Sequence, residues 1–307
     1  MEHYVTLFDG GFLPQGLALY RSLVRLDEPF RLWVLCVDEA AYHALVSLNF
    51  KEIKPLSLKA LETPALLAVK EGRNRAEYCW TLTPFAPRFV FQSDPRVQRV
   101  TYLDADLWFL RSPKPIFSEF EGAEKSVLIT EHAYHPPYDL TETSGRFCVQ
   151  FMTFVKGASE PVRQRWEDQC LEWCFDRIQD GRFGDQKYVD AWPTEFSGLV
   201  HVLEHPAWTR APWNVLRFQD KSPIFYHFHG LRLSRWGILR GSYPIPRSAM
   251  DAFYKTYFED IAWALKKMAS IKLPCPIQAP AHRFARQALA RIKRIILQPS
   301  DFMRLFS

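Results

Sequence analysis

Short apolar runs and helix-like stretches alternate along the first third of the chain. Residues 3–8 and 30–37 are near-continuous apolar runs, typical of parallel strands buried on both faces. Apolar residues at helical spacing follow each run, over residues 16–26 and 38–48. The alternation predicts an α/β fold with a Rossmann-like, mainly parallel sheet flanked by helices. In such sheets ligands bind beyond the carboxyl ends of the strands.

Two aspartates follow the apolar strand expected over residues 99–103. An extended backbone would point the side chains of Asp104 and Asp106 to the same face, because strand side chains alternate with period two. Two carboxylates on one face can hold a hard cation such as Mg²⁺ or Mn²⁺, which keeps open positions for phosphates. Aspartates that merely cap a turn are the alternative. Asp9, which follows the first strand, lies at the same predicted edge and favours a metal or nucleotide site.

Two later segments carry further candidate residues. Gly184-Asp185-Gln186 opens a short helix, where an N-capping aspartate beside an exposed glutamine is the simpler interpretation. Residues 225–230 form a late strand with His227 and His229 on one face. A histidine on an apolar strand is more often a core residue than a metal ligand. The order of all these segments along the chain favours a functional site.

Length and composition indicate a folded globular protein. The chain has 307 residues, of which 48% are hydrophobic, enough for a sizeable core. The six cysteines contain no Cys-x-x-Cys pair and are interpreted as reduced thiols. The start of the chain has no signal-peptide pattern, and no apolar run reaches the ~18 residues of a membrane span. We therefore expect a cytoplasmic protein, with any membrane contact peripheral on the inner face.

Positive charge is concentrated near the end of the chain. The net charge is +5, and residues 261–300 hold eight Lys or Arg and no Asp or Glu, so the remainder carries −3. Beyond a Pro-rich linker at 273–280, residues 281–296 place apolar residues on one side of a helix and basic residues on the other. This pattern predicts a helix that lies on an anionic membrane. Docking of that helix on the domain is the alternative, and nucleic acid is not an expected partner because no nucleic-acid module accompanies the tail.

Taken in order, the motifs of residues 3–245 resemble those of the family 8 glycosyltransferases. The resemblance rests on Val5-Thr6-Leu7-Phe8-Asp9-Gly10-Gly11-Phe12, Asp104-Ala105-Asp106, Gly184-Asp185-Gln186 and His227-Phe228-His229-Gly230. It implies the GT-A fold, a single nucleotide-binding α/β domain merged with an acceptor half. It also implies transfer of a sugar from a nucleotide-diphosphate donor with retention of anomeric configuration. The sequence singles out no carboxylate as the nucleophile of a covalent intermediate, and front-face attack is the route we expect.

The resemblance also assigns roles to individual residues. Asp104, Asp106 and His227 would bind Mn²⁺ or Mg²⁺, with His229 as the second choice of histidine. Asp185 would hold the donor sugar and Gln186 would lie near its anomeric carbon. The donor nucleotide, expected to be a UDP-sugar, would contact Thr6, Leu7, Phe8, Asp9, Gly11, Arg75, Leu103, Ala105, Gly230, Arg232 and Arg235.

The sequence departs from the family pattern at three places. The usual Lys-Pro-Trp is replaced by Leu233-Ser234-Arg235, so Arg232 or Arg235 must replace the phosphate-binding lysine. Residues 78–81 lack the basic residue that relatives carry before the aspartate strand, and Arg75 is the nearby substitute. Gln150 stands where relatives have a small residue, which predicts an altered sugar pocket.

These observations predict a metal-dependent glycosyltransferase that moves a hexose or related sugar to a cell-surface glycan or lipid-linked acceptor. Residues 1–245 would form the GT-A domain, with a nucleotide-binding half (1–117) and an acceptor half (118–245). Residues 246–272 would add a packed C-terminal helix, and 273–307 the linker and basic helix. A nucleotide-sugar-binding scaffold without turnover is the main alternative. A phosphohydrolase with Asp104 as nucleophile is disfavoured by Trp108-Phe109-Leu110, which lacks a small or hydroxyl residue.

Overall fold

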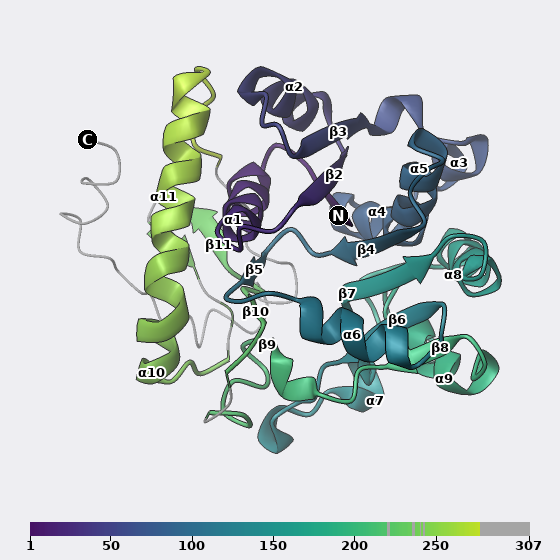
Figure 1. The fold of residues 1–307 in the computed structure, drawn as a ribbon. Helices are drawn as coiled ribbons and strands as arrows, with labels where there is room; N and C mark the ends of the chain where they lie inside the picture. The colour runs from purple at the N-terminus through teal and green to yellow at the C-terminus, as the bar shows by residue number, and fades with distance from the viewer. Residues whose placement is uncertain (220–221, 235–236, 240, 242, 277–307) are drawn as a thin grey trace.

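The computed structural model describes residues 1–219, 222–234, 237–239, 241 and 243–276 (Figure 1). Within these residues the main sheet has seven strands in the order β3-β2-β1-β4-β7-β6-β8. The first four in that order run parallel, β7 is antiparallel to β4 and to β6, and β8 is parallel to β6. The predicted α/β class with a mainly parallel sheet is confirmed. The strands are β1 Glu2–Phe8, β2 Phe30–Cys36, β3 Ile53–Ser57, β4 Arg99–Leu103, β6 Val127–Glu131, β7 Phe147–Val155 and β8 Val200–Val202.

Helices cover both faces of the sheet, as the continuous burial of residues 4–8 in β1 requires. Tyr4 and Phe8 pack into one core layer with helices α1, α2, α6 and α11, whereas Val5 and Leu7 pack into the opposite layer with α3, α4 and α5. A third layer joins β6 and β7 to α8 and α9. The helices are α1 Leu13–Val24, α2 Glu39–Leu48, α3 Pro64–Lys70, α4 Arg75–Leu82, α5 Ala86–Ser93, α6 Lys114–Gly122, α7 Thr141–Ser144, α8 Glu160–Glu172, α9 Trp192–Glu195, α10 Arg247–Ala249 and α11 Lys255–Ser270.

The turn after β1 leads directly into α1, and the helix packs closely against the end of the strand. Pro14 lies in the first turn of α1, where a missing N–H costs nothing, so the helix begins three residues earlier than its apolar spacing predicts. A side chain at Gly16 would collide with the Phe8 ring, and only glycine lets α1 pack this closely on the end of β1. The carboxyl end of β1 is thereby held against the helix.

A smaller sheet brings the late part of the chain to the aspartates. It consists of β5 Leu107–Phe109, β10 Phe225–His227 and β9 Thr209–Arg210, with β10 antiparallel to β5. His227 pairs with Leu107 in this register, and the N–H of Phe228 donates to the carbonyl of Asp106 at 2.9 Å. A ribbon of β11 Arg232–Ser234 and β12 Gly237–Leu239 follows.

The predicted reason for the convergence of the aspartates is wrong, although the residues do converge. Asp104, Ala105 and Asp106 form a turn between β4 and β5, closed by the Leu107 N–H on the Asp104 carbonyl at 3.1 Å, and they are not part of an extended strand.

The helix predicted over residues 160–178 is also too long. It ends at Glu172 because Trp173 is extended and the indole and the Phe175 ring pack against arginines of the following loop.

The final described helix runs beside α1 (Figure 1). A π-helical stretch, Met250–Tyr254, joins α10 to α11, so residues 247–270 form one helical segment as predicted. Among the described residues, no helix is long and apolar enough to span a membrane. The predicted basic helix over 281–296 lies outside the described residues, as does most of the Pro-rich linker.

Candidate active site

Three predicted metal ligands meet where β4 and β10 end. Nε2 of His227 lies 3.0 Å from Oδ1 of Asp106 and 3.6 Å from Oδ2 of Asp104. One ligand atom from each residue lies within 4.8 Å of the other two. Asp106 and His227 are buried, and Asp104 keeps 24% of its side-chain surface exposed. The cluster is therefore buried on the side of Asp106 and His227 and accessible to solvent at Asp104.

Burial and mutual charge separate the two aspartates electrostatically. Burial raises the pKa of Asp104 to about 6; the negative charge of Asp106 adds to this rise and His227 opposes it. Burial would raise the pKa of Asp106 as well, but the His227 charge and hydrogen bond hold it well below its usual range. Burial opposes the protonation of His227, yet the two carboxylates raise its pKa. Excess negative charge in this cluster is what a cation would neutralise.

A second acidic pair lies at the same sheet edge, after β1 and β2. Asp9 and Asp38 both form ion pairs with the guanidinium of Arg75, which stands at the start of α4. Oδ1 of Asp38 also accepts from the N–H groups of Gly10 at 3.0 Å and Ala41 at 2.9 Å. Oδ1 of Asp9 accepts from the N–H of Phe12 at 3.1 Å. The structure thus brings together Asp9 and Arg75, which the sequence proposed separately.

The other proposed nucleotide-contacting residues surround this edge. Thr6, Leu7 and Phe8 are buried in β1, and no described residue hydrogen-bonds the Thr6 hydroxyl. Gly11 follows in the turn, where an added Cβ would lie 3.0 Å from Oδ1 of Asp9. Leu103 ends β4, and Ala105 lies between the two aspartates, buried against the core.

The ribbon after β10 supplies one arginine. Gly230 turns the chain at φ +75°, a conformation that favours glycine, and Arg232 follows at the start of β11. The Arg232 guanidinium stacks on the Phe12 ring at 4.7 Å. Burial lowers the pKa of Arg232, and the negative charges of Asp106 and Asp9 oppose that lowering. Arg235, the alternative phosphate-binding residue, lies outside the described residues.

Asp185 and Gln186 are fixed by the backbone beside the metal cluster. Asp185 is 3% exposed, and Oδ2 of its carboxylate has no hydrogen-bond partner among the described residues. Burial, reinforced by the charge of Asp104, raises the pKa of Asp185 to about 7. Gln186 donates from Nε2 to the Ser144 carbonyl at 2.5 Å. Neither side chain caps the short helix that follows, Lys187–Ala191, so the N-capping interpretation is wrong.

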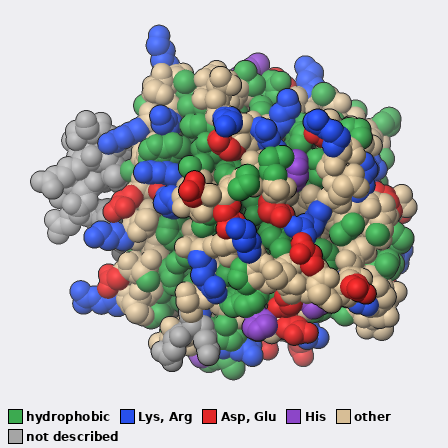
Figure 2. All heavy atoms as spheres, viewed as in Figure 1, with side chains coloured by type: hydrophobic (Ala, Val, Ile, Leu, Met, Phe, Trp, Pro, Cys, Tyr) green, Lys and Arg blue, Asp and Glu red, His purple; other side chains and the backbone are tan. Residues whose placement is uncertain are grey.

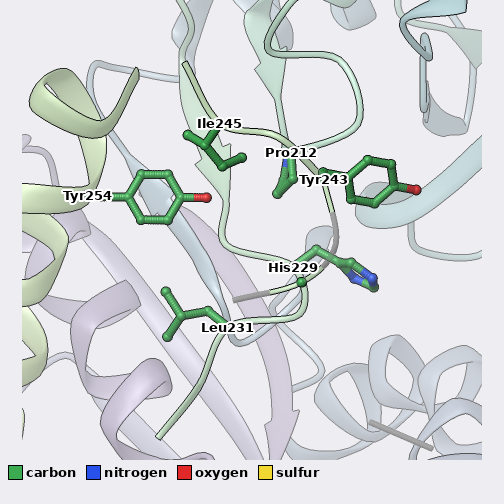
Figure 3. Close-up of a pocket in the computed structure, with 7 residues that line it drawn as sticks. Pro212, His229, Leu231, Tyr243, Ile245 and Tyr254 are labelled. Atoms are coloured by element: carbon green, nitrogen blue, oxygen red, sulfur yellow. The ribbon is translucent and has the colours of Figure 1, made fainter. Parts of the chain in front are cut away.

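His229 lies beside His227, with the two rings 5.6 Å apart and both edge-on to Trp213, and it also lines a separate recess. It lies in the turn after β10, is exposed, and is not part of the cluster formed by Asp104, Asp106 and His227. Figure 3 shows it with the Tyr254 ring, which enters from the helical side. The recess is mainly apolar and aromatic, and it is lined by Pro212, His229, Leu231, Tyr243, Ile245 and Tyr254.

Two residues of the site were not proposed from sequence. Asp38 was interpreted only as the start of a helix, although an acidic residue directly after a parallel strand is the same signal that identified Asp9. Trp213 packs edge-on against the His227 ring at 5.3 Å, and its indole N–H donates to the His132 carbonyl at 2.9 Å. No local pattern marks Trp213, because the carbonyl that its indole binds lies 81 positions away in the sequence.

Comparison with known proteins agrees with this geometry at the level of the fold. No protein-family model matches the chain. The solved galactosyltransferase LgtC, in complex with donor and acceptor sugar analogues, superposes with a TM-score of 0.54 at 14% identity, covering 93% of this chain and 99% of LgtC. Mouse xyloside xylosyltransferase 1 in its apo form superposes with a TM-score of 0.52 at 17% identity, covering 74% of this chain and 97% of that one.

Sequence relatives cover most of the chain. The uncharacterized protein YfnF of Bacillus subtilis (strain 168) is 30% identical over 288 residues, 87% of this chain and 94% of YfnF. The uncharacterized protein YfnD of the same organism is 32% identical over 247 residues, 75% of this chain and 78% of YfnD. The chain has the GT-A glycosyltransferase fold and belongs to the protein family of YfnF and YfnD.

Proposed function

We propose that this protein is a metal-dependent glycosyltransferase that uses a nucleotide-diphosphate sugar as donor. The observation that carries the proposal is the convergence of Asp104, Asp106 and His227 at the carboxyl edge of a GT-A sheet. Ligands of open α/β sheets bind at this edge. A cluster of this composition beside several buried polar atoms without partners is typical of a ligand site rather than of a structural ion pair.

The chemistry of the three donors fits Mn²⁺ or Mg²⁺. Carboxylate oxygens suit hard divalent cations, and one imidazole nitrogen is compatible with Mn²⁺. A cation held there would act as a Lewis acid that neutralises the charge of a leaving diphosphate. Asp106 and His227 would supply buried ligands, while Asp104, partly exposed, would face the donor.

Arg75 and Arg232 are the cationic groups that we assign to the donor. Arg75 orders Asp9 and Asp38 at the ends of β1 and β2, where those carboxylates would accept hydrogen bonds from a nucleoside. Arg232, held against Phe12, would contact the phosphates. The unpartnered hydroxyl of Thr6 would donate or accept at the same edge. UDP is the nucleotide we expect.

Asp185 and Gln186 would address the transferred sugar. The unpartnered oxygen of Asp185 would accept from sugar hydroxyls, and the Gln186 amide would lie near the anomeric carbon. The aromatic recess beside His229 is our candidate for the acceptor, a glycan or glycolipid, because Tyr243 and Tyr254 offer flat apolar rings with polar tips (Figure 3). We further propose a hexose as the transferred group, with retention by front-face attack.

Domain roles follow the same proposal. Residues 1–245 would form the transferase unit, divided at residue 117 into nucleotide-binding and acceptor halves, with 246–272 packed on it. Residues 273–307 would bring a cytoplasmic enzyme to the inner face of the membrane, where a lipid-linked acceptor in polysaccharide or lipopolysaccharide synthesis would lie. The basic amphipathic pattern of the tail supports this arrangement.

The test is a melting-temperature screen of the full chain with nucleotide diphosphates and nucleotide sugars, with and without Mn²⁺. We expect a donor whose stabilisation depends on Mn²⁺, and slow Mn²⁺-dependent hydrolysis of that donor. Asp106→Ala should abolish the metal-dependent stabilisation and lower hydrolysis by about 10²-fold or more. Binding without hydrolysis would instead favour a nucleotide-sugar-binding scaffold.

A matched control removes a carboxylate from the opposite end of β4. Glu121 pairs with Arg99, the first residue of that strand, on the surface. Glu121→Ala should leave the Mn²⁺-dependent stabilisation unchanged. Absence of any metal-dependent donor stabilisation in the wild type would refute the proposed function.

A further inference from the structure

Gln150 holds two of the three residues in the candidate metal cluster. Its backbone carbonyl accepts from the N–H of Asp104 at 3.0 Å. Its side-chain Oε1 lies 2.9 Å from Nδ1 of His227. Gln150 is fully buried, with 0% of its surface exposed. The His227 imidazole therefore has an amide oxygen at one nitrogen and the two carboxylates at the other.

The strand is irregular where Gln150 stands. Leu128 of β6 pairs with Thr153 of β7, but Thr130 pairs with Cys148, so β7 advances five residues while β6 advances two. Extra residues of this kind bend a strand and re-aim its side chains, and they are over-represented beside active sites. Gln150 lies inside the irregular stretch, which aims its side chain at β10 of the smaller sheet.

Both ring nitrogens of His227 face acceptors in the ligand-free protein, Nε2 at Oδ1 of Asp106 (3.0 Å) and Nδ1 at Oε1 of Gln150 (2.9 Å). An amide oxygen only accepts hydrogen bonds, so the 2.9 Å contact requires a proton on Nδ1. If a cation displaces the proton on Nε2, Nδ1 keeps its own proton. The lone pair of Nε2 then points toward Asp104 and Asp106 and is free to bind the cation. The edge-on Trp213 ring, at 5.3 Å, holds the imidazole in this orientation. Leucine or a small residue at position 150 would leave the tautomer undetermined.

We propose that Gln150 is a positioning residue that selects the tautomer of His227 in which Nε2 binds the divalent cation. The inference rests on the proposed function, in which His227 is a metal ligand. It gives Gln150 a role in metal affinity rather than in the shape of the sugar pocket. Partners of this kind, which hold the second nitrogen of a metal-binding histidine, typically change metal affinity by about 10–100-fold.

The experiment measures Mn²⁺ binding to the full chain by calorimetry, without any sugar donor. Gln150→Leu removes the acceptor, and the Mn²⁺ affinity should fall by about 10–100-fold. Gln150→Glu keeps an acceptor at the same place and should bind Mn²⁺ at least as tightly as the wild type. Gln150→Met replaces the leucine variant if that one does not fold, as judged by its melting transition.

A spectroscopic readout separates tautomer selection from loss of structure. With ¹⁵N-labelled histidine and Zn²⁺ as a diamagnetic probe, His227 of the wild type and of Gln150→Glu should show a proton on Nδ1. The signal is assigned by its loss in His227→Gln. Gln150→Leu should show a weakened or exchanging Nδ1 proton. Wild-type Mn²⁺ affinity in the leucine variant would overturn only this inference, whereas absence of Mn²⁺ binding in the wild type would overturn both proposals.

Discussion

Four of the buried polar atoms without partners belong to the candidate site or to residues beside it. The Thr6 hydroxyl, Nε2 of Gln150, one oxygen of Asp185 and the Tyr257 hydroxyl have no hydrogen-bond partner within the described part of the chain. An unsatisfied buried polar group costs about 1–3 kcal/mol, so these four atoms are candidates for contact with a bound ligand. Asp106 and Arg232 both act on the pKa of Tyr257, which relates α11 to the same site.

Asp185 should reduce the stability of the ligand-free protein at neutral pH. Its folded pKa is raised to about 7 by burial and by Asp104, so the folded chain retains a proton that the unfolded chain releases near the ordinary aspartate pKa of 3.8. Stability is therefore lost as the pH rises between these two values. Asp185→Asn should stabilise the ligand-free chain on the order of 2 kcal/mol at pH 8 and much less at pH 5, while abolishing transfer. Urea unfolding at both pH values measures this.

Asp180→Asn is the control for that measurement, since Asp180 lies in the preceding loop with its side chain 73% exposed. It should change stability little at either pH. An equal gain from Asp185→Asn at pH 5 and pH 8 would contradict the argument from a buried charge.

The sequence predicted which residues form the candidate site better than it predicted the backbone conformation that brings them together. Asp104, Asp106 and His227 were proposed as ligands and do lie together. Period-two reasoning assumed an extended strand at Asp106, which lies in a turn, but the side chains of His227 and His229 do lie together, with their rings 5.6 Å apart. The role of Gln150 could not be predicted, because its contact with His227 spans 77 positions.

Helix α11 packs against the two segments that follow the candidate metal ligands, and one buried carboxylate anchors it there. Asp260 is 1% exposed, forms ion pairs with Arg21 of α1 and with Arg25 directly after that helix, and accepts from the Trp108 indole at 2.7 Å. Trp108 belongs to β5, two residues after Asp106. On the same face of α11, one turn earlier, the Tyr257 ring stacks on Phe228 at 3.6 Å, next to His227. The helix thus contacts the segments that follow both ligands.

Asp260→Ala should lower the free energy of unfolding by about 2–4 kcal/mol, because it removes the acceptor of a buried indole and leaves two arginines unpaired. Asp260→Asn keeps an acceptor for Trp108 and should cost less. Urea denaturation measures both. Asp94→Ala is the comparison, since Asp94 pairs with Arg96, whose side chain is 90% exposed, and it should cost little. An alanine variant as stable as the wild type would show that α11 is held by apolar packing alone.

The order of the first elements was predictable, and the later pairing was not. Alternation of apolar runs and helices indicates β1, β2 and β3 as neighbouring parallel strands, because right-handed crossovers leave few arrangements. The insertion of β7 between β4 and β6, and the pairing of β5 with β10, depend on contacts across more than 40 and 100 positions. Apolar periodicity carries no information on such partners.

For the whole molecule, charge divides the chain into two unequal parts. Residues 274–307 contain six Lys or Arg and one Asp, a net charge of +5 that equals that of the entire chain, so residues 1–273 are neutral overall. On the face shown in Figure 2, basic and acidic side chains are interspersed rather than gathered by sign. An electrostatic attraction to anionic lipid would therefore come from the tail.

Deleting residues 274–307 should release the protein from anionic vesicles while sparing donor hydrolysis. Each basic residue contributes about 1 kcal/mol near an anionic surface, so the loss should be large at low salt and small at high salt. Co-sedimentation with phosphatidylserine-containing vesicles measures it, and phosphatidylcholine vesicles, which should bind neither form, are the lipid control. A full-length variant with glutamine at Arg283, Arg286, Lys293 and Arg294 should behave like the truncation. Equal binding of the truncated and full-length chains would eliminate the tail as the membrane anchor, and with it the argument for a lipid-linked acceptor.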